Sequence, residues 1–104
     1  MIRAKFEKKA DMHNITVRGH AGYAPHGRDI VCSGVSAVVF GLIGFIDNNS
    51  EHIQEKKIHF SDGDFDLFII GDEKIEAGVE FALISISQIA EKYPENVKVE
   101  MKGW

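Results

Sequence analysis

The sequence predicts an α+β fold with two layers, a largely antiparallel sheet that carries two helices on one face. Three observations lead to this fold class. Several short segments alternate apolar and polar residues as half-buried strands do, and two longer segments repeat apolar residues every three or four positions as helices do. These segments follow one another in the order ββαββα, with a short final strand, and this order favours a two-layer domain. The length of 104 residues suits one domain, which we assign to residues 1–104.

The first two strands are predicted by strict alternation of inward apolar residues with polar ones. The inward set is Ile2, Ala4, Phe6, Ile15 and Val17. A turn around residues 10–12 joins the two strands, and Thr16 and Arg18 of the second strand point outward. Between Gly19 and Gly27, three glycines and a proline in nine residues end the alternation. This composition predicts a loop that is rich in groups that titrate.

The first helix is predicted from Asp29 to about Asn48. Asp29 is a good N-cap, because its carboxylate can accept a hydrogen bond from a backbone N–H two or three residues on. One stripe of the helix is apolar, at Val35, Val38, Val39, Leu42, Ile43 and Ile46. The opposite side is small rather than charged, at Ser33, Gly34, Ala37, Gly41 and Gly44. A helix without a charged face is covered on both sides, so we expect a homodimer in which a second copy supplies the second cover.

The same helix raises the question of a membrane span. Residues 30–46 contain no charge, and their length is at the lower edge of what crosses a bilayer. Small and polar residues interrupt this stretch, and segments that need a common sheet flank it. We therefore predict a buried helix and no membrane partner.

The second half of the chain repeats the pattern of hairpin and helix. Residues 57–60 and 65–70 flank the turn of residues 61–64, in which Asp-Gly predicts a type I′ turn with positive φ at both central residues. Asp72 caps a second helix, whose apolar stripe is Ile75, Val79, Leu83, Ile86 and Ala90. Pro94 ends this helix, and a final strand alternates Val97, Val99 and Met101. The pattern establishes the helices but leaves the order of the strands open.

The charge balance argues against one class of partner. Twelve Lys and Arg against 16 Asp and Glu give a net charge of −4. Surfaces that bind nucleic acid usually show a basic excess, so we expect no direct nucleic-acid binding. A local patch at Lys8, Lys9, Lys56 and Lys57 is the one place left open.

Cysteine usage points to a reducing compartment. Cys32 is the only cysteine, which excludes an internal disulfide and any CxxC motif. The first ten residues contain no apolar run of the kind a signal peptide needs. We therefore expect a cytoplasmic protein.

His20 and Cys32 form the candidate site. With Asp29 as N-cap, Cys32 is at position N3, at the positive end of the helix dipole, where a thiolate is favoured. An imidazole brought near could accept the thiol proton and later protonate a leaving amine. Backbone N–H groups of the first helical turn could bind an oxyanion. The alternative is a small buried core cysteine, which most free cysteines are.

The neighbouring polar residues have weaker assignments. Asp29 is the nearest candidate to orient His20, although the helix cap explains it equally well. Ser36 lies one turn after Cys32 and either hydrogen-bonds in the site or packs. His26 belongs to the same loop as His20. The remaining histidines are expected on the surface, and these are His13, His52 and His59.

A metal site is a weaker use of the same region. Nitrogen, oxygen and sulfur donors are offered by His20, His26, Asp29 and Cys32. Zinc sites do combine such ligands, but spacings of six, three and three residues match no zinc pattern that we can identify. We predict no metal and no cofactor.

Two blocks of sequence resemble a known signature. Gly19-His20-Ala21 is followed by a short glycine-containing loop and then by Gly-Arg-Asp-Ile-Val-Cys at residues 27–32. This pattern resembles the Prp family, the ribosomal-processing cysteine proteases of Firmicutes and related bacteria. Chain length, acidic charge and the ββαββα order agree over essentially the whole chain. The family often has Ala after the cysteine where this chain has Ser33, which is a small-for-small change.

The resemblance implies a function and residue roles. The family cleaves a short N-terminal extension from ribosomal large-subunit protein twenty-seven, after a hydrophobic, Phe-rich motif, during ribosome assembly. Its members are homodimers with a two-layer fold, and the nucleophile and base fall on Cys32 and His20. Residues 1–104 are then one cysteine protease domain, with the ribosomal protein precursor as partner. Two alternatives remain open, a ribosome-assembly module that binds without cutting and a metal-dependent hydrolase.

The loop of residues 21–28 is expected to act as a lid over the substrate. Gly22 and Gly27 bracket Tyr23 and His26, and glycines at both ends let a segment pivot. Tyr23 offers an aromatic surface for a Phe-containing peptide. We expect this loop to be poorly ordered without substrate and to close on binding. The alternative is a mobile surface loop with no role.

Overall fold

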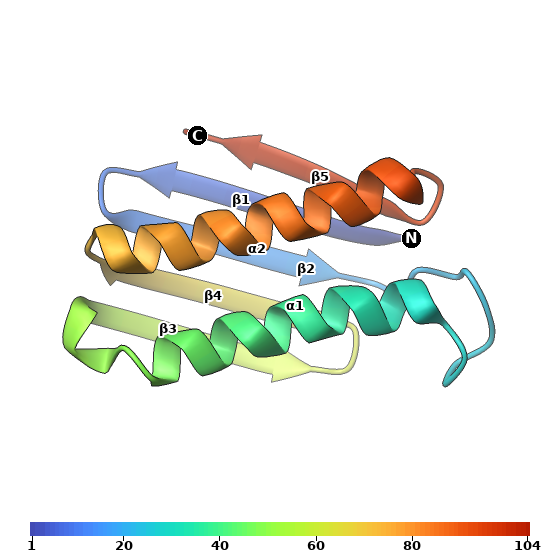
Figure 1. Ribbon diagram of the computed structural model, residues 1–104, viewed down its shortest axis with the longest axis horizontal. Coiled ribbons are helices and arrows are strands. Elements are labelled where there is room, and N and C mark those ends of the chain that lie inside the picture. The colour runs from blue at the N-terminus through green and yellow to red at the C-terminus, as the bar shows by residue number, and fades with distance from the viewer.

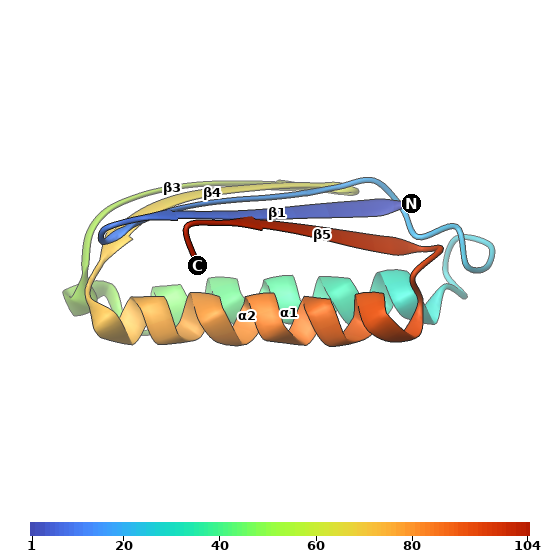
Figure 2. The same cartoon turned by 90° about the horizontal axis from the view of Figure 1, so that it is seen from above.

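A five-stranded sheet forms one layer and two long helices form the other in the computed structural model, which describes residues 1–104 (Figure 1). In chain order the elements are β1 (Ile2–Lys9), β2 (Met12–Arg18), α1 (Ile30–Asp47), a short 3-10 turn (Ser50–His52), β3 (Ile53–Ser61), β4 (Asp64–Gly71), α2 (Glu73–Lys92) and β5 (Val97–Lys102). Figure 2 shows both helices on one face of the sheet, with the other face open. The predicted α+β class and the order ββαββα with a final strand are confirmed.

The strand order determines what lies beside the end of β2. The order is β3-β4-β2-β1-β5, and all neighbours are antiparallel except β1 and β5. The central strand β2 therefore lies between β1 and β4. In this register Arg18, its last residue, is opposite Arg3 on one side and Asp64 on the other. As a result, the residues that follow Arg18 emerge next to the β3–β4 turn.

The core lies between the sheet and the helices, and the residues predicted to face inward are buried in it. Its strand residues include all five predicted inward positions, each at most 8% exposed. The helices contribute Val31, Val35, Val39, Leu42, Ile46, Ile75, Val79, Ala82, Leu83 and Ile86. Burying a Val, Leu, Ile or Phe side chain fully contributes roughly 1.5–3 kcal/mol. These two apolar stripes therefore hold the helix layer on the sheet.

Helix α1 has one buried side and one exposed side. It is the one helix that is long and apolar enough to cross a bilayer by composition, with a mean hydropathy of 2.1. In this structure its buried residues face the sheet, whereas Phe40, whose ring lies 5.0 Å from that of Phe60 in β3, is 55% exposed. Helix α2 packs beside α1, and a Cβ at Gly78 would collide with the ring of Phe45. The small residue at 78 thus allows the two helices to approach closely.

The β3–β4 turn differs from the predicted type I′ turn. Gly63 has φ +72°, but Asp62 is not among the residues with positive φ. A positive φ at the second central residue alone is the requirement of a type II turn. The type I′ prediction is therefore wrong, although the hairpin itself is present.

The surface position expected for His13 is also wrong. His13 is 1% exposed and belongs to the inward side of β2, with the same parity as Ile15 and Val17. Its ring lies 5.4 Å from that of Trp104, and its Nδ1 has no hydrogen-bond partner. Strand alternation could have revealed this burial, since a residue two before Ile15 shares its face. His59 is exposed and His52 is partly exposed.

The lysines left open as a basic patch are split across the sheet. Lys9 ends β1 and follows Lys8, whereas Lys56 and Lys57 lie in the edge strand β3. Lys8 forms an ion pair with Glu76 of α2. Lys56 Nζ lies 3.3 Å from a carboxylate oxygen at the end of α1. These four residues therefore do not form one continuous cationic surface.

Candidate active site

The two predicted catalytic residues come together where β2 ends and α1 begins. His20 follows the last residue of β2 by two positions, and Cys32 is the third residue of α1. Cys32 Sγ lies 3.9 Å from His20 Nδ1. The imidazole is exposed and the thiol is half-buried. This geometry lets the imidazole accept the thiol proton, and such contacts shorten when substrate binds.

Asp29 caps α1 and also fixes the preceding loop. Its Oδ1 accepts a hydrogen bond from Cys32 N at 2.9 Å, which confirms the predicted N-cap. Its Oδ2 accepts hydrogen bonds from Tyr23 N at 2.9 Å and Ala24 N at 3.4 Å. These bonds, led by the one from Cys32, lower the pKa of the Asp29 carboxyl. The carboxylate makes no hydrogen bond to His20, so in this structure it does not orient the imidazole.

The cap also occupies donors that an oxyanion could use. Cys32 N donates to the Asp29 side chain, and Ser33 N donates to the Asp29 carbonyl oxygen at 3.0 Å. An oxyanion site needs backbone donors aimed at the reacting oxygen. The N–H groups of Cys32 and Ser33 are both engaged elsewhere in this arrangement.

Two cavities meet at the Cys32–His20 pair. The larger one, of about 420 Å³, lies between the loop and α1, and its lining includes Gly22, His26, Gly27 and Asp29. The smaller one, of about 60 Å³, has an apolar side made by Val35, Val39, Phe60 and Phe65. Ser36 and Asp62 line both cavities together with the pair. A bound peptide therefore has a polar and an apolar recess within reach of the sulfur.

Among the four loop residues assigned to substrate contact, Gly22, Tyr23, His26 and Gly27, only Tyr23 lines neither cavity. Its ring meets that of Tyr93 edge-on at 5.3 Å, and the side chain is 48% exposed. The loop is tethered further by Asn96 Nδ2, which donates to Ala21 O at 3.0 Å. Closure of this loop over a substrate stays a prediction.

Sequence reasoning missed the contribution of the β3–β4 turn. Asp62 lines both cavities, and the backbone of Gly63 lies against the imidazole of His20. The Asp-Gly signal located this turn correctly in the sequence. Its position beside His20 depends on β4 being the neighbour of β2, which alternation does not reveal.

The predicted nitrogen, oxygen and sulfur donors do not converge. His20 and Cys32 are in contact, whereas Asp29 is bonded to backbone N–H groups. No group of three His, Cys, Asp or Glu side chains lies close enough together to hold a metal ion. The arrangement is that of a thiol–imidazole pair.

Comparison with known proteins identifies the class of this site. The family model described as cysteine protease Prp matches residues 1–98. The chain belongs to the Prp family. It is 30% identical over 89 residues to the ribosomal processing cysteine protease Prp of Mycoplasma pneumoniae, covering 85% of this chain and 86% of that protein. The Prp of Staphylococcus aureus is 30% identical over 91 residues, with 86% of each chain covered.

Solved Prp structures share this fold. The crystal structure of S. aureus Prp with a covalently linked product peptide matches with a TM-score of 0.80 and 26% identity, over 98% of this chain and 100% of that one. S. aureus Prp with a substrate peptide gives a TM-score of 0.75, also at 26% identity and with the same coverage. This Prp family member is therefore a cysteine protease, a hydrolase of peptide bonds, with the α+β fold of its relatives.

Proposed function

We propose that this Prp family member removes a short N-terminal extension from ribosomal large-subunit protein twenty-seven. Cys32 is the nucleophile and His20 is the base and acid. The observation that carries this proposal is the Sγ–Nδ1 distance of 3.9 Å at the point where two cavities meet. The relatives' description as ribosomal processing proteases supports the substrate class.

The chemistry follows from the positions of the two side chains. His20 accepts the proton of Cys32, and Sγ attacks the carbonyl carbon of the scissile bond. The tetrahedral intermediate collapses as the imidazolium gives its proton to the leaving amine. This step leaves a thioester between Cys32 and the extension. His20 then accepts a proton from water, which attacks the thioester and releases the extension as a carboxylic acid.

An aromatic cluster beside the site supports a hydrophobic, Phe-containing substrate. The rings of Phe40 and Phe60 lie 5.0 Å apart, and those of Phe60 and Phe65 lie 6.3 Å apart. Phe40 is 55% and Phe60 is 43% exposed, so they offer apolar surface to a ligand. Aromatic pairs are worth about 0.5–1.5 kcal/mol beyond the area that they bury. This cluster suits aromatic residues of the extension.

The proposed active form is a homodimer. An apolar groove of about 650 Å³ runs between α1 and α2 on the side away from the sheet, and its lining includes Gly41, Phe45 and Phe81. Phe81 is 73% exposed and Ile84 is 52% exposed. A twofold partner that presents the same surface would cover both copies. Light scattering at micromolar concentration should give twice 11.6 kDa, and a single species at the monomer mass would contradict this assembly.

The test of the proposed function uses the precursor with its extension. Mass spectrometry should show two fragments with the wild-type enzyme and an intact chain with Cys32→Ser, because a serine hydroxyl forms an alkoxide far less readily than a thiol forms a thiolate. Iodoacetamide should abolish cleavage, and a chelator should leave it unchanged. Cleavage by Cys32→Ser at the wild-type rate would refute the nucleophile.

The substrate part of the proposal needs its own comparison. Phe60→Ala should raise KM for the precursor, whereas Met101→Ala, an exposed apolar residue of β5, should not. A precursor that binds to the wild-type enzyme but stays uncut would favour a binding module on this substrate. Equal KM values for the two variants would exclude the aromatic cluster from substrate binding.

A further inference from the structure

The β3–β4 turn lies against the imidazole of His20 on the edge away from Cys32. A Cβ at Gly63 would be 2.7 Å from Nε2, 3.0 Å from Cε1 and 3.4 Å from Cδ2. The other ring nitrogen, Nδ1, faces Cys32 Sγ. Only a residue without a side chain lets the turn approach this closely. The ring is therefore held between the backbone of the turn and the thiol.

The same turn fixes the backbone that leads into His20. Gly19 N donates a hydrogen bond to Gly63 O at 2.9 Å. Gly63 has φ +72°, a conformation that glycine adopts without steric cost. One residue of the turn thus contacts both the ring of His20 and the peptide just before it.

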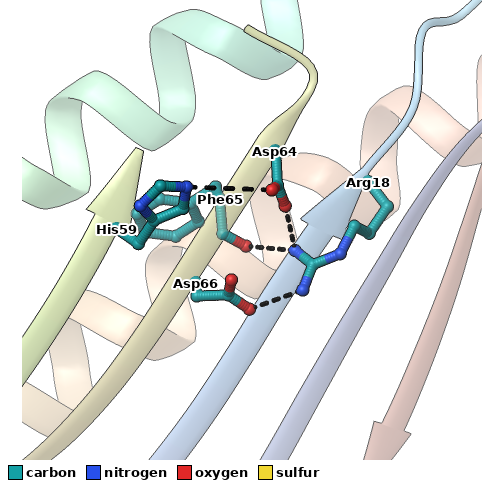
Figure 3. Close-up of polar contacts among 5 residues, drawn as sticks. All are labelled: Arg18, His59, Asp64, Phe65 and Asp66. Atoms are coloured by element: carbon teal, nitrogen blue, oxygen red, sulfur yellow. Dashed lines mark hydrogen bonds and ion pairs between the residues drawn. The ribbon is translucent and has the colours of Figure 1, made fainter. Parts of the chain in front are cut away.

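Arg18 holds the end of β2 to the strand that leaves this turn (Figure 3). Its Nη1 lies 2.6 Å from Asp64 Oδ1 and donates to Phe65 O at 3.0 Å. Its Nη2 donates to Asp66 Oδ1 at 2.7 Å. These three partners are the first three residues of β4. Arg18 precedes His20 by two residues, so its guanidinium fixes the spacing between the turn and the chain that carries the imidazole.

His20 has no carboxylate to orient it. Its side chain makes a polar contact with Cys32 and with no other residue, and the nearest candidate, Asp29, is occupied by backbone N–H groups. Catalytic imidazoles are usually held by a third group that hydrogen-bonds the second ring nitrogen. Here the second nitrogen faces Gly63.

We propose that Gly63 and Arg18 are positioning residues for the Cys32–His20 pair. Gly63 backs the imidazole by direct contact, and Arg18 holds the turn where this contact is made. The proposal rests on the proposed function in that it takes Cys32 and His20 as the reacting pair. In this arrangement the backbone of the turn takes the place of an orienting carboxylate.

Gly63→Ala tests the contact with the ring. The new methyl group meets the end of a flexible side chain, so the imidazole shifts rather than the fold. A displacement of about 1 Å lowers turnover about 100-fold, and we expect this loss in kcat with KM little changed. The pH profile of iodoacetamide alkylation should move toward that of His20→Ala. Wild-type kcat with a wild-type alkylation profile would overturn the role of Gly63.

A double-mutant cycle separates positioning from backbone strain. Alanine at position 63 also strains the backbone, because φ is positive there. This strain is present with or without the imidazole, so it cancels when alkylation rates are compared in wild-type and His20→Ala backgrounds. We expect Gly63→Ala to slow alkylation only when His20 is present. Equal slowing in both backgrounds would show a merely structural role.

Arg18→Ala tests the clamp, with Arg3→Ala as the matched control. Arg3 is opposite Arg18 in β1 and is exposed, and it forms no ion pair. We expect Arg18→Ala to lower kcat about 10-fold, because it displaces the ring less than Gly63→Ala, for which the expected loss is roughly 100-fold. Arg18→Lys should restore part of the loss, and Arg3→Ala should have no effect. Equal kcat values for Arg18→Ala and Arg3→Ala would overturn the role of Arg18.

The alkylation measurements need no ribosomal substrate. A wrong substrate assignment therefore leaves them valid, and they test positioning in the free enzyme. If His20→Ala itself leaves the alkylation profile unchanged, the thiol–imidazole pair is refuted, and both positioning roles are refuted with it.

Discussion

Two histidines at the two ends of β2 have opposite surroundings. His20, just after the strand, is exposed and faces a thiol. His13, the second residue of the strand, is 1% exposed and packs against Trp104. An imidazole suits either a buried or an exposed environment, because its protonation responds to burial and to its partners. The difference shows that the partner and the access of solvent, rather than the residue type, distinguish a histidine placed beside a thiol from one that packs in the core.

The surroundings of His13 favour its neutral form. Burial lowers the pKa of His13 and is the largest cause, and Lys8 acts in the same direction. Glu76 and Asp11 oppose this shift. Lys8 lies opposite His13 in β1, and its Nζ lies 5.3 Å from the centre of the Trp104 ring. His13 is thus a buried base, and the nearby carboxylates of Glu76 and Asp11 do not outweigh the cost of burying its charged form.

The largest expected effect is on turnover. His20→Ala should lower kcat by about 10²–10⁴-fold, which is the usual contribution of a general acid–base group. His13→Phe keeps a ring of similar size in the core and should leave kcat unchanged. Initial rates on the precursor, normalised to folded enzyme, measure both. A comparable loss of kcat in the two variants would remove the functional contrast.

The free energy of unfolding should respond in the reverse order, with the larger loss at His13 and the smaller at His20. His13→Ala removes a buried ring and should lower the free energy of unfolding by about 2 kcal/mol or more. His20→Ala changes an exposed side chain and should stay within about 0.5 kcal/mol. Urea unfolding followed by circular dichroism measures both. If His20→Ala proves the more destabilising variant, the imidazole of His20 contributes to packing, and the contrast with His13 is wrong.

The two ends should also differ in their response to acid. The lowered pKa of His13 means that the unfolded chain binds a proton more readily than the folded protein. This contribution to stability is present above the ordinary value of 6.5 and is lost as the pH falls below it. The Tm should therefore drop between pH 7.5 and 5.5, and His13→Phe should drop less. Identical pH profiles of Tm would show that His13 is not the group responsible.

A smaller effect is expected from the cap at the His20 end. Asp29→Ala should lower the Tm, because Cys32 N, Tyr23 N and Ala24 N lose their acceptor. Asp29→Asn keeps one acceptor oxygen and should lower the Tm less. The lowered pKa of Asp29 places its acid sensitivity below 3.8, well apart from that of His13. Loss of cleavage in Asp29→Asn without loss of Tm would give Asp29 a role in the chemistry.

The smallest expected effect concerns motion of the loop. Hydrogen exchange over residues 21–28 should slow when the Cys32→Ser protein binds the extension peptide, as expected for a lid. The amides around His13 should not respond, since they lie at the far end of β2. Equal exchange of the loop with and without saturating peptide would exclude closure.

Sequence patterns predicted local structure well because local structure depends on local chemistry. The cap at Asp29, the buried stripe of α1 and the hairpin at Asp62-Gly63 all follow from neighbouring residues. The parallel pairing of β5 with β1 does not, because alternation assigns a face and says nothing about neighbours. The core of the fold was therefore predictable and the strand order was not.

The candidate site divides in the same way. Cys32 and His20 could be paired from the sequence, since a helix start and a strand end bracket one short loop. Gly63 and Arg18 could not, because their contacts join segments more than 40 residues apart. The burial of His13 was partly predictable. Its position in the strand alternation indicated a buried side chain, but its closeness to a turn indicated an exposed one.

The single tryptophan and the single cysteine of the chain report separately on these two regions. Trp104 covers His13 and Cys32 faces His20, so the two probes lie near opposite ends of β2. The seven residues of this strand span about 20 Å at roughly 3.3 Å per residue. Indole fluorescence and thiol accessibility therefore record unfolding at opposite ends of the sheet without any added label. Coincident transitions would show that the whole sheet unfolds cooperatively, and separate transitions would show which end opens first.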